Sequence, residues 1–327
     1  MYLYVMGRGH SGSTILGILL AGGAAVESLG EIVSGLERYE AGEPCGCGAA
    51  MRDCPFWSGV RRRFEAEGLD WAEFAALSRW QTDVRRWPAT RLAAMDEPKR
   101  VRLATMTEAL ARAVAAESGK PHVLDSNKEV ARALFLLRYL PAARVIHLVR
   151  DPRGIQRSHH WRITGSDHGI KFMRRHWRSA GAIGRPLLLL LAAASWTAGN
   201  GLCELVARAA PDRVLRVRYE DLRSDPAGTL RRIGATFGLP LEDVARMVER
   251  GEPVPVGHNV GGNHVRYEGR VRFDAAAERA RPPLPRWAEA ATLALCWPLM
   301  RRYGYPLRAA TSGGPVLSGR ARPEGTG

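Results

Sequence analysis

A glycine-rich turn between a short apolar run and an apolar helical pattern constrains this chain most. Residues 3–6 are apolar, residues 15–20 continue as an apolar helix pattern, and the turn reads Gly7-Arg8-Gly9-His10-Ser11-Gly12-Ser13-Thr14. A strand, a glycine-rich turn and a helix N-terminus form a cradle for anions, because free backbone N–H groups and the helix dipole face the same point. The segment therefore predicts an anion-binding loop. The alternative is a turn without a ligand, but the hydroxyl groups at Ser11, Ser13 and Thr14 exceed what a turn requires.

Three further apolar runs resemble buried strands, at residues 122–125, 145–149 and 214–218, and another strand is expected just before Ser28. Turn residues and then a helical pattern follow each run. Strands that alternate with helices are typical of a parallel sheet covered on both faces. We therefore expect an α/β, three-layer P-loop-type fold with a central parallel sheet and helices on both faces.

The region 57–118 interrupts this alternation with a helical pattern rich in Arg, Ala and Trp. We interpret it as a helical insertion over the sheet edge, and we expect tryptophans such as Trp57 and Trp71 to line a pocket there. Residues 309–327 are rich in Gly, Ser, Pro, Arg and Thr, which predicts a disordered tail. Residues 1–308 are expected to form a single domain.

The chain is basic, with 48 Lys and Arg against 33 Asp and Glu in 327 residues, a net charge of +15. This excess points to an anionic partner: nucleic acid, membrane lipid or an anionic small molecule. The first residues lack the pattern of a signal peptide, and the apolar run 187–194 is shorter than a membrane span. We expect a cytoplasmic protein with mostly reduced thiols and no stable membrane insertion.

The glycine-rich turn almost matches the nucleotide-binding pattern G-x4-G-K-[ST]. Gly7, Gly12 and Thr14 occupy their expected positions, but Ser13 stands where that pattern has lysine. The lysine reaches the β- and γ-phosphates in nucleotide hydrolases. Its replacement disfavours ATP or GTP hydrolysis.

A second motif, Val149-Arg150-Asp151-Pro152-Arg153-Gly154, follows a predicted strand, with Ser158 further along. Pro152 fits the first turn of a helix. An arginine at a strand end and a serine in the next helix can hold one phosphate between them. The alternative is a buried ion pair between Arg150 and Asp151.

These two motifs resemble those of sulfotransferases that depend on 3′-phosphoadenosine 5′-phosphosulfate (PAPS), of the bacterial type and similar to carbohydrate and tyrosylprotein sulfotransferases. The segment His10-Ser11-Gly12-Ser13-Thr14 resembles their 5′-phosphosulfate loop, R-S-G-[ST]-[ST], with His10 in place of Arg or Lys. Arg8, separated from it by Gly9, is our candidate for the missing cation. Arg150 and Ser158 have the spacing of the family's 3′-phosphate motif.

Further segments carry the same resemblance in the family's order. Lys128, in Asp125-Ser126-Asn127-Lys128, would lie near the bridging oxygen of the phosphosulfate. Tyr219 would lie near the adenine, or else in the core. Gly262, Asn263 and Arg266 match the G-N-x-x-R loop of bacterial members, which closes over the nucleotide, and Arg266 would add charge near the 3′-phosphate.

The resemblance also implies catalytic roles. Glu31, in Ser28-Leu29-Gly30-Glu31, stands where related enzymes carry a Gly-Glu whose carboxylate is the base. It is our first candidate, although a glutamate at a helix N-terminus is also favoured by the helix dipole. His10 is the second candidate, and Lys128 would stabilise charge on the leaving phosphate oxygen. This mechanism requires no metal.

The implied function is transfer of the sulfuryl group from PAPS to a hydroxyl or amine of a small-molecule or carbohydrate acceptor, with release of 3′-phosphoadenosine 5′-phosphate (PAP). The helical insertion would then cover the acceptor site, and a bacterial role in natural product biosynthesis is expected. One alternative is a P-loop small-molecule kinase, which Ser13 disfavours. The other is a non-enzymatic basic nucleic-acid binder, for which no sequence signature is present. No nucleic-acid partner is expected, and the protein is expected to be a monomer or homodimer.

Three cysteines, Cys45, Cys47 and Cys54, lie within ten residues. Three thiols can hold zinc when a fourth ligand joins them. Their spacing is not that of a standard zinc site, and no histidine is near them in the sequence. Bacterial sulfotransferases often carry a similar segment, and we interpret it as a structural loop beside the acceptor pocket. A disulfide, a zinc site and free thiols all remain open.

Overall fold

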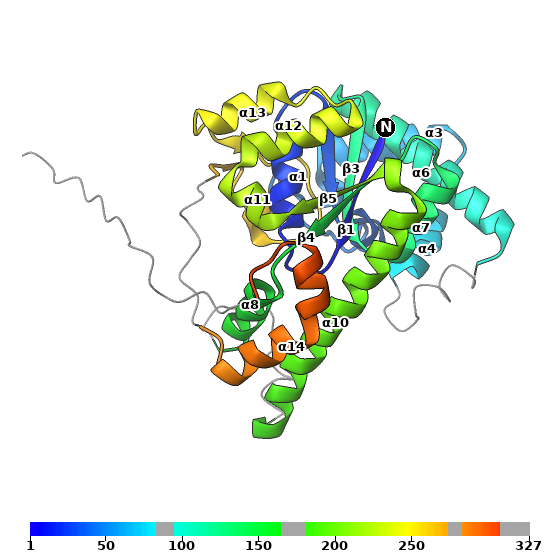
Figure 1. The fold of residues 1–327 in the computed structure, drawn as a ribbon. Coiled ribbons are helices and arrows are strands. Elements are labelled where there is room, and N and C mark those ends of the chain that lie inside the picture. Colours follow the sequence, from blue (N-terminus) through cyan, green and yellow to red (C-terminus); the bar gives the residue numbers. More distant parts are fainter. Residues whose placement is uncertain (83–94, 165–180, 274–282, 308–327) are drawn as a thin grey trace, which may run out of the picture.

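The computed structural model describes residues 1–82, 95–164, 181–273 and 283–307, and it contains one central parallel sheet (Figure 1). Neighbouring strands all pair in the same direction. In spatial order the strands are β2 (Val26–Gly30), β3 (His122–Lys128), β1 (Tyr2–Gly7), β4 (Arg144–Val149) and β5 (Val214–Arg218). All the expected strands are thereby confirmed.

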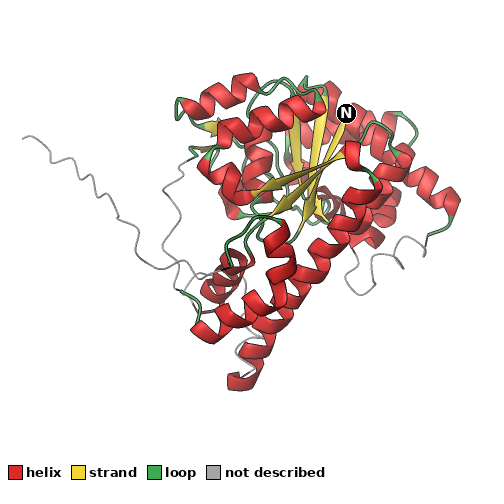
Figure 2. Ribbon diagram, in the orientation of Figure 1, coloured by secondary structure: helices red, strands yellow, loops and turns green. Residues whose placement is uncertain are grey.

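The sheet lies between two helical layers, as Figure 2 shows, and β1 illustrates why. Its residues 2–6 are all buried, but alternate side chains enter different cores. Tyr2 and Tyr4 pack into one hydrophobic cluster, whereas Leu3 and Val5 pack into another. A strand with a continuous apolar sequence suits this position, because both faces of the sheet are covered. The expected three-layer α/β fold is correct.

Helices follow the strands and also fill the interval between β2 and β3. Their bounds are α1 (Ser13–Ala21), α2 (Ile32–Glu37), α3 (Pro55–Ala66), α4 (Trp71–Thr82), α6 (Glu97–Ser118), α7 (Val130–Tyr139), α8 (Pro152–Thr164), α10 (Gly181–Ala209), α11 (Tyr219–Ser224), α12 (Pro226–Phe237), α13 (Glu242–Glu249) and α14 (Arg286–Arg302). The helices α1, α12 and α13 pack into the cluster that holds Leu3, and α3, α6 and α7 into the cluster that holds Tyr4.

The predicted helical region 57–118 contains α3, α4 and α6, and α6 contacts both β2 and β3. Trp57 is fully buried and Trp71 is 3% exposed, and both belong to the hydrophobic core. The expectation that these two tryptophans line a pocket is therefore wrong, since their rings hold the inserted helices together. The proposed tail, 309–327, lies outside the described residues.

The long helix α10 extends beyond the sheet and packs along α14 (Figure 1). Its segment Pro186–Ala209 is long and apolar enough to cross a membrane, a property that the shorter run 187–194 did not indicate. Its C-terminal half nevertheless contacts strands of the sheet, and Glu204 there is buried and binds Arg216 and Arg302 (2.6 Å each). That half belongs to the folded core, and the absence of membrane insertion stays a prediction.

A buried ion pair holds the end of β3 against β1 and α7. Arg132 Nε donates to Asp125 Oδ2 (2.5 Å), and both side chains are fully buried. The Tyr2 hydroxyl donates to the same carboxylate oxygen (3.0 Å) and accepts from Arg132 Nη2 (2.9 Å). Burial raises the pKa of Tyr2, so the phenol keeps its proton.

Replacing Arg132 with methionine should lower the free energy of unfolding by about 3–5 kcal/mol, because the Asp125 carboxylate would stay buried without its cation. Urea unfolding followed by circular dichroism measures the change. Arg112→Met is the matched control, since Arg112 binds Glu67 at the exposed surface (2.6 Å), where ion pairs contribute little. Equal losses for the two variants would contradict this account.

Candidate active site

The loop after β1 adopts the conformation that the glycine-rich sequence predicts. Gly12 has φ +96°, and α1 begins directly after it at Ser13. A side chain on Gly12 would overlap the ring of Tyr219, and one on Gly7 would lie 2.5 Å from the carbonyl oxygen of Leu148. Both positions therefore require glycine, one for its backbone angle and both for close packing.

This loop offers donors for an anion. No side chain caps the N-terminus of α1, so the first N–H groups of the helix are left for a ligand. Within the described part of the chain, the Ser11 hydroxyl is 1% exposed and has no hydrogen-bond partner. A buried hydroxyl without a partner is costly unless a ligand supplies one.

Arg150 lies beside this loop, directly after β4. Its Nη1 donates to the carbonyl oxygen of His10 (3.0 Å), and its guanidinium stacks on the ring of Tyr219, 4.2 Å from the centroid. The carboxylate of neighbouring Asp151 binds Arg153 (2.6 Å). The side chain of Arg150 therefore joins the second motif to the backbone of the first, and it also contacts Tyr219.

Ser158 lies in α8, one helical turn after Gly154, and is 3% exposed. A side chain on Gly154 would lie 3.3 Å from Arg150 Nε, so the arginine crosses the first turn of this helix. Residues four apart share a helix face. Arg150 and Ser158 are therefore on the same side of α8.

Glu31 and Lys128 form an ion pair at the ends of β2 and β3, with the lysine Nζ donating to Glu31 Oε1. The two side chains are 29% and 15% exposed. Glu31 is the N-cap of the six-residue helix α2, but its carboxylate caps no N–H group there. Lys128 has φ +75°, which is strained for a residue with a side chain. The two predicted catalytic residues thus meet, and Glu31 also lies at a helix N-terminus, so its role as the base stays a prediction.

The loop around residues 257–263 lies beside the end of β2 and contacts this site. Val260 N donates to Leu29 O (3.1 Å), and Glu31 N donates to Val260 O (2.7 Å). Asn263 N donates to the hydroxyl of Thr14 (3.2 Å). A side chain on Gly262 would lie 2.8 Å from that hydroxyl and 3.7 Å from Glu31 Oε1. The predicted closing loop therefore touches both the anion loop and Glu31.

Two predicted cations have protein partners. Arg8 lies against α10, where it donates to the Ser195 hydroxyl and contacts Gly199. Arg266 is 5% exposed and binds Glu43 (3.3 Å). Their roles toward a nucleotide stay predictions. Gly9, between Arg8 and His10, is exposed in the loop.

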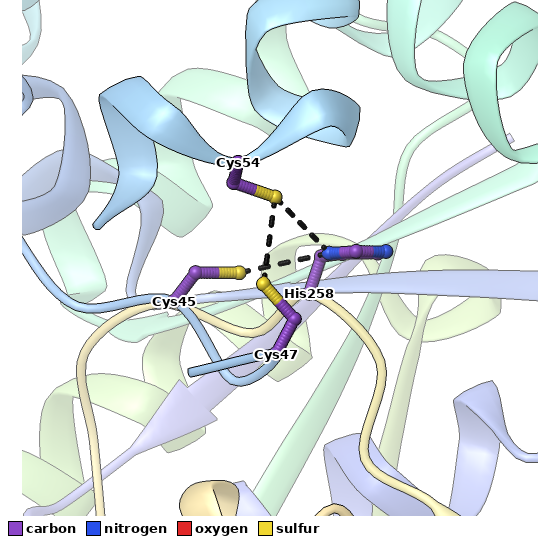
Figure 3. A group of neighbouring side chains, drawn as sticks. All are labelled: Cys45, Cys47, Cys54 and His258. Carbon is purple, nitrogen blue, oxygen red and sulfur yellow. Dashed lines mark hydrogen bonds between the residues drawn. The ribbon is translucent and has the colours of Figure 1, made fainter. Parts of the chain in front are cut away.

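The sequence analysis missed one partner of the three cysteines. His258 Nδ1 lies 3.3 Å from Cys54 Sγ and 3.6 Å from Cys45 Sγ, and Cys47 Sγ lies 3.6 Å from Cys54 Sγ (Figure 3). Burial lowers the pKa of His258, so its imidazole is neutral at pH 7. More than 200 residues separate this histidine from the cysteines, and no local spacing signals the contact.

Similar solved structures include a sulfotransferase domain from the Synechococcus PCC 7002 olefin synthase (18% identity, 94% of this chain and 95% of that chain, TM-score 0.48). Others are the sulfotransferase domain from the curacin biosynthetic pathway (17%, 94% and 98%, 0.49) and sulfotransferase STF9 from Mycobacterium avium (15%, 93% and 77%, 0.49). No curated protein sequence matches the chain.

The chain also matches a protein-family model. The model of the sulfotransferase family matches residues 3–243, which is well over half of the chain and includes β1 to β5, the anion loop, Glu31, Lys128 and Arg150. The chain therefore belongs to the sulfotransferase family.

Proposed function

We propose that this sulfotransferase moves the sulfuryl group from PAPS to a hydroxyl or amine of a small-molecule or carbohydrate acceptor and releases PAP. The observation that carries the proposal is the contact of Arg150 with both His10 and Tyr219. PAPS has a phosphosulfate at one end of its ribose and a phosphate at the other, so it needs two neighbouring anion sites. The loop at Gly12 and the segment around Arg150 and Ser158 supply them.

The donor would bind as follows. The phosphosulfate accepts from the first N–H groups of α1 and from the Ser11 hydroxyl, which is buried and otherwise without a partner. The guanidinium of Arg150, which contacts both His10 and Tyr219, is the group proposed to bind the 3′-phosphate, because its planar fork suits phosphate oxygens. The ring of Tyr219 stacks on the Arg150 guanidinium and would lie near the adenine. Ser13 in place of lysine argues against a kinase.

Glu31 and Lys128 divide the chemistry of the transfer. The acceptor oxygen attacks sulfur in line, a new O–S bond forms, and the S–O bond to the 5′-phosphate breaks. Glu31 takes the proton from the acceptor hydroxyl, and the ammonium of Lys128 stabilises the negative oxygen on PAP. Their ion pair holds the two side chains together before the donor binds. His10 is the second candidate for the base.

Donor binding tests the proposal directly. PAP should raise the melting temperature of the protein more than ATP does at the same concentration, since only PAP has a 3′-phosphate for Arg150. Transfer of ³⁵S from labelled PAPS to a panel of hydroxyl acceptors then identifies the product. Stabilisation by ATP alone would support the kinase instead.

Arg150→Ala should weaken PAP binding by about 1.5–3 kcal/mol, the contribution of hydrogen bonds to a charged group. Isothermal titration calorimetry measures the affinity for PAP and for AMP, which lacks the 3′-phosphate. The loss should be large for PAP and small for AMP. Arg157→Ala, on an exposed position of α8, should leave both affinities unchanged. Equal losses for the two nucleotides would show that Arg150 does not read the 3′-phosphate.

Glu31→Gln should lower kcat by about 10²–10⁴-fold, the usual contribution of a positioned base, while PAP affinity stays within a factor of two or three. His10→Ala is the companion variant, measured with the same acceptor. If Glu31→Gln keeps the full rate and His10→Ala loses it, the base is His10.

A further inference from the structure

Three thiols and one imidazole converge outside the proposed active site. Cys45 and Cys54 are buried, Cys47 is exposed, and His258 is half-buried (Figure 3). Their four ligand atoms all lie within 4.8 Å of one another. We propose that these residues bind one structural Zn²⁺ ion, independently of the identity of the sulfuryl donor.

The distances match a tetrahedral site. Zinc with Zn–S bonds of about 2.3 Å and a Zn–N bond of about 2.0 Å separates two sulfurs by about 3.8 Å and a sulfur from the nitrogen by about 3.5 Å. The sulfurs of Cys47 and Cys54 are 3.6 Å apart. His258 Nδ1 is 3.6 Å from the sulfur of Cys45 and 3.3 Å from that of Cys54. These three distances therefore match one tetrahedral coordination sphere, and the other distances between ligand atoms are within 4.8 Å.

The donor set selects zinc. Thiolate sulfur and imidazole nitrogen in a tetrahedral arrangement suit Zn²⁺, whereas Mg²⁺ and Ca²⁺ prefer oxygen ligands. Four protein ligands leave no open position for water or substrate, which is typical of a structural site. On binding, each of the three thiols releases a proton, and the bound group then carries a net charge of −1.

The surroundings hold the ligands in place. The ring of His258 stacks on Phe56, with centroids 4.4 Å apart and planes 9° apart. Trp57 Nε1 donates to the carbonyl oxygen of His258 (3.0 Å). Cys54 is the N-cap of α3, where the positive end of the helix dipole favours a thiolate.

The metal would join two loops that meet at the active site. Gly46 N donates to Asn259 O (2.8 Å), and the backbone of Cys45 forms an isolated antiparallel β-bridge with Val260. Val260 in turn accepts from the backbone N–H of Glu31. Zinc would therefore fix the position of the closing loop relative to Glu31 without touching the reacting atoms.

Metal content of the full-length protein, purified without chelators, tests the site. Mass spectrometry of the metal should find about one zinc per chain. Replacement by Co²⁺ should give the visible absorption of tetrahedral cobalt together with sulfur-to-metal charge transfer. Removing the metal with a chelator should lower the melting temperature.

Variants separate this site from adventitious binding. Cys47→Ser should lose most of the zinc and the cobalt charge-transfer intensity, and its exposed position should let the variant fold. His258→Ala should lose zinc as well. Cys203→Ala is the matched control, because this buried cysteine in α10 lies outside the cluster, and it should keep the full zinc content.

Two results would overturn the proposal. A zinc-free protein with five titratable thiols after denaturation would show free cysteines, and one with three thiols would show a disulfide. Full zinc content in both Cys47→Ser and His258→Ala would place the metal elsewhere. PAP affinity can be measured on the same samples, so failure of the zinc site is distinguishable from failure of the proposed donor.

Discussion

The parallel direction of the five strands of the central sheet is the constraint on which the site depends. Parallel strands end at one edge of a sheet, and each connection that follows starts from that edge. Here each strand ends at a residue or loop with a proposed role: the loop at Gly12 after β1, Glu31 after β2, Lys128 as the last residue of β3, Arg150 after β4 and Tyr219 after β5. Helix N-termini gather at the same edge, so backbone dipoles and side-chain cations would act together on the proposed donor.

One residue at this edge, Lys128, has a strained backbone, and buried polar contacts offset the cost in stability. Lys128 has a left-handed backbone, a conformation that costs of order 1–3 kcal/mol for a non-glycine residue. The preceding turn is held because Asn127 N donates to Asp125 Oδ1 (2.9 Å), and the same carboxylate binds Arg132 in the core. A buried ion pair is weak evidence for stability by itself, but here it orients the strand end that presents Lys128 to Glu31.

The strands and the glycine-rich loop could be predicted because their signals are local, whereas the pairing of this loop with the Arg150 segment was implied by the family resemblance. Apolar runs, glycine positions and the spacing from Arg150 to Ser158 lie within a few residues of one another. Contacts between distant segments left no such signal. Arg266 binds Glu43 across 223 residues, and Trp57, expected at a pocket, is buried because its ring packs against inserted helices. The partners of polar side chains, rather than the elements, were hard to predict.

The proposed metal cluster and the proposed base are linked by a short stretch of backbone. His258 would bind the metal, Val260 pairs with the end of β2, and Gly262 approaches both Thr14 and Glu31. A loop without regular structure has few contacts of its own to hold it, so anchors at both ends reduce the conformations available to Glu31. The segment 45–54, which carries the cysteines, would thereby act on the proposed chemistry through the loop. A metal bound outside the proposed active site would in this way affect catalysis without contacting the substrate.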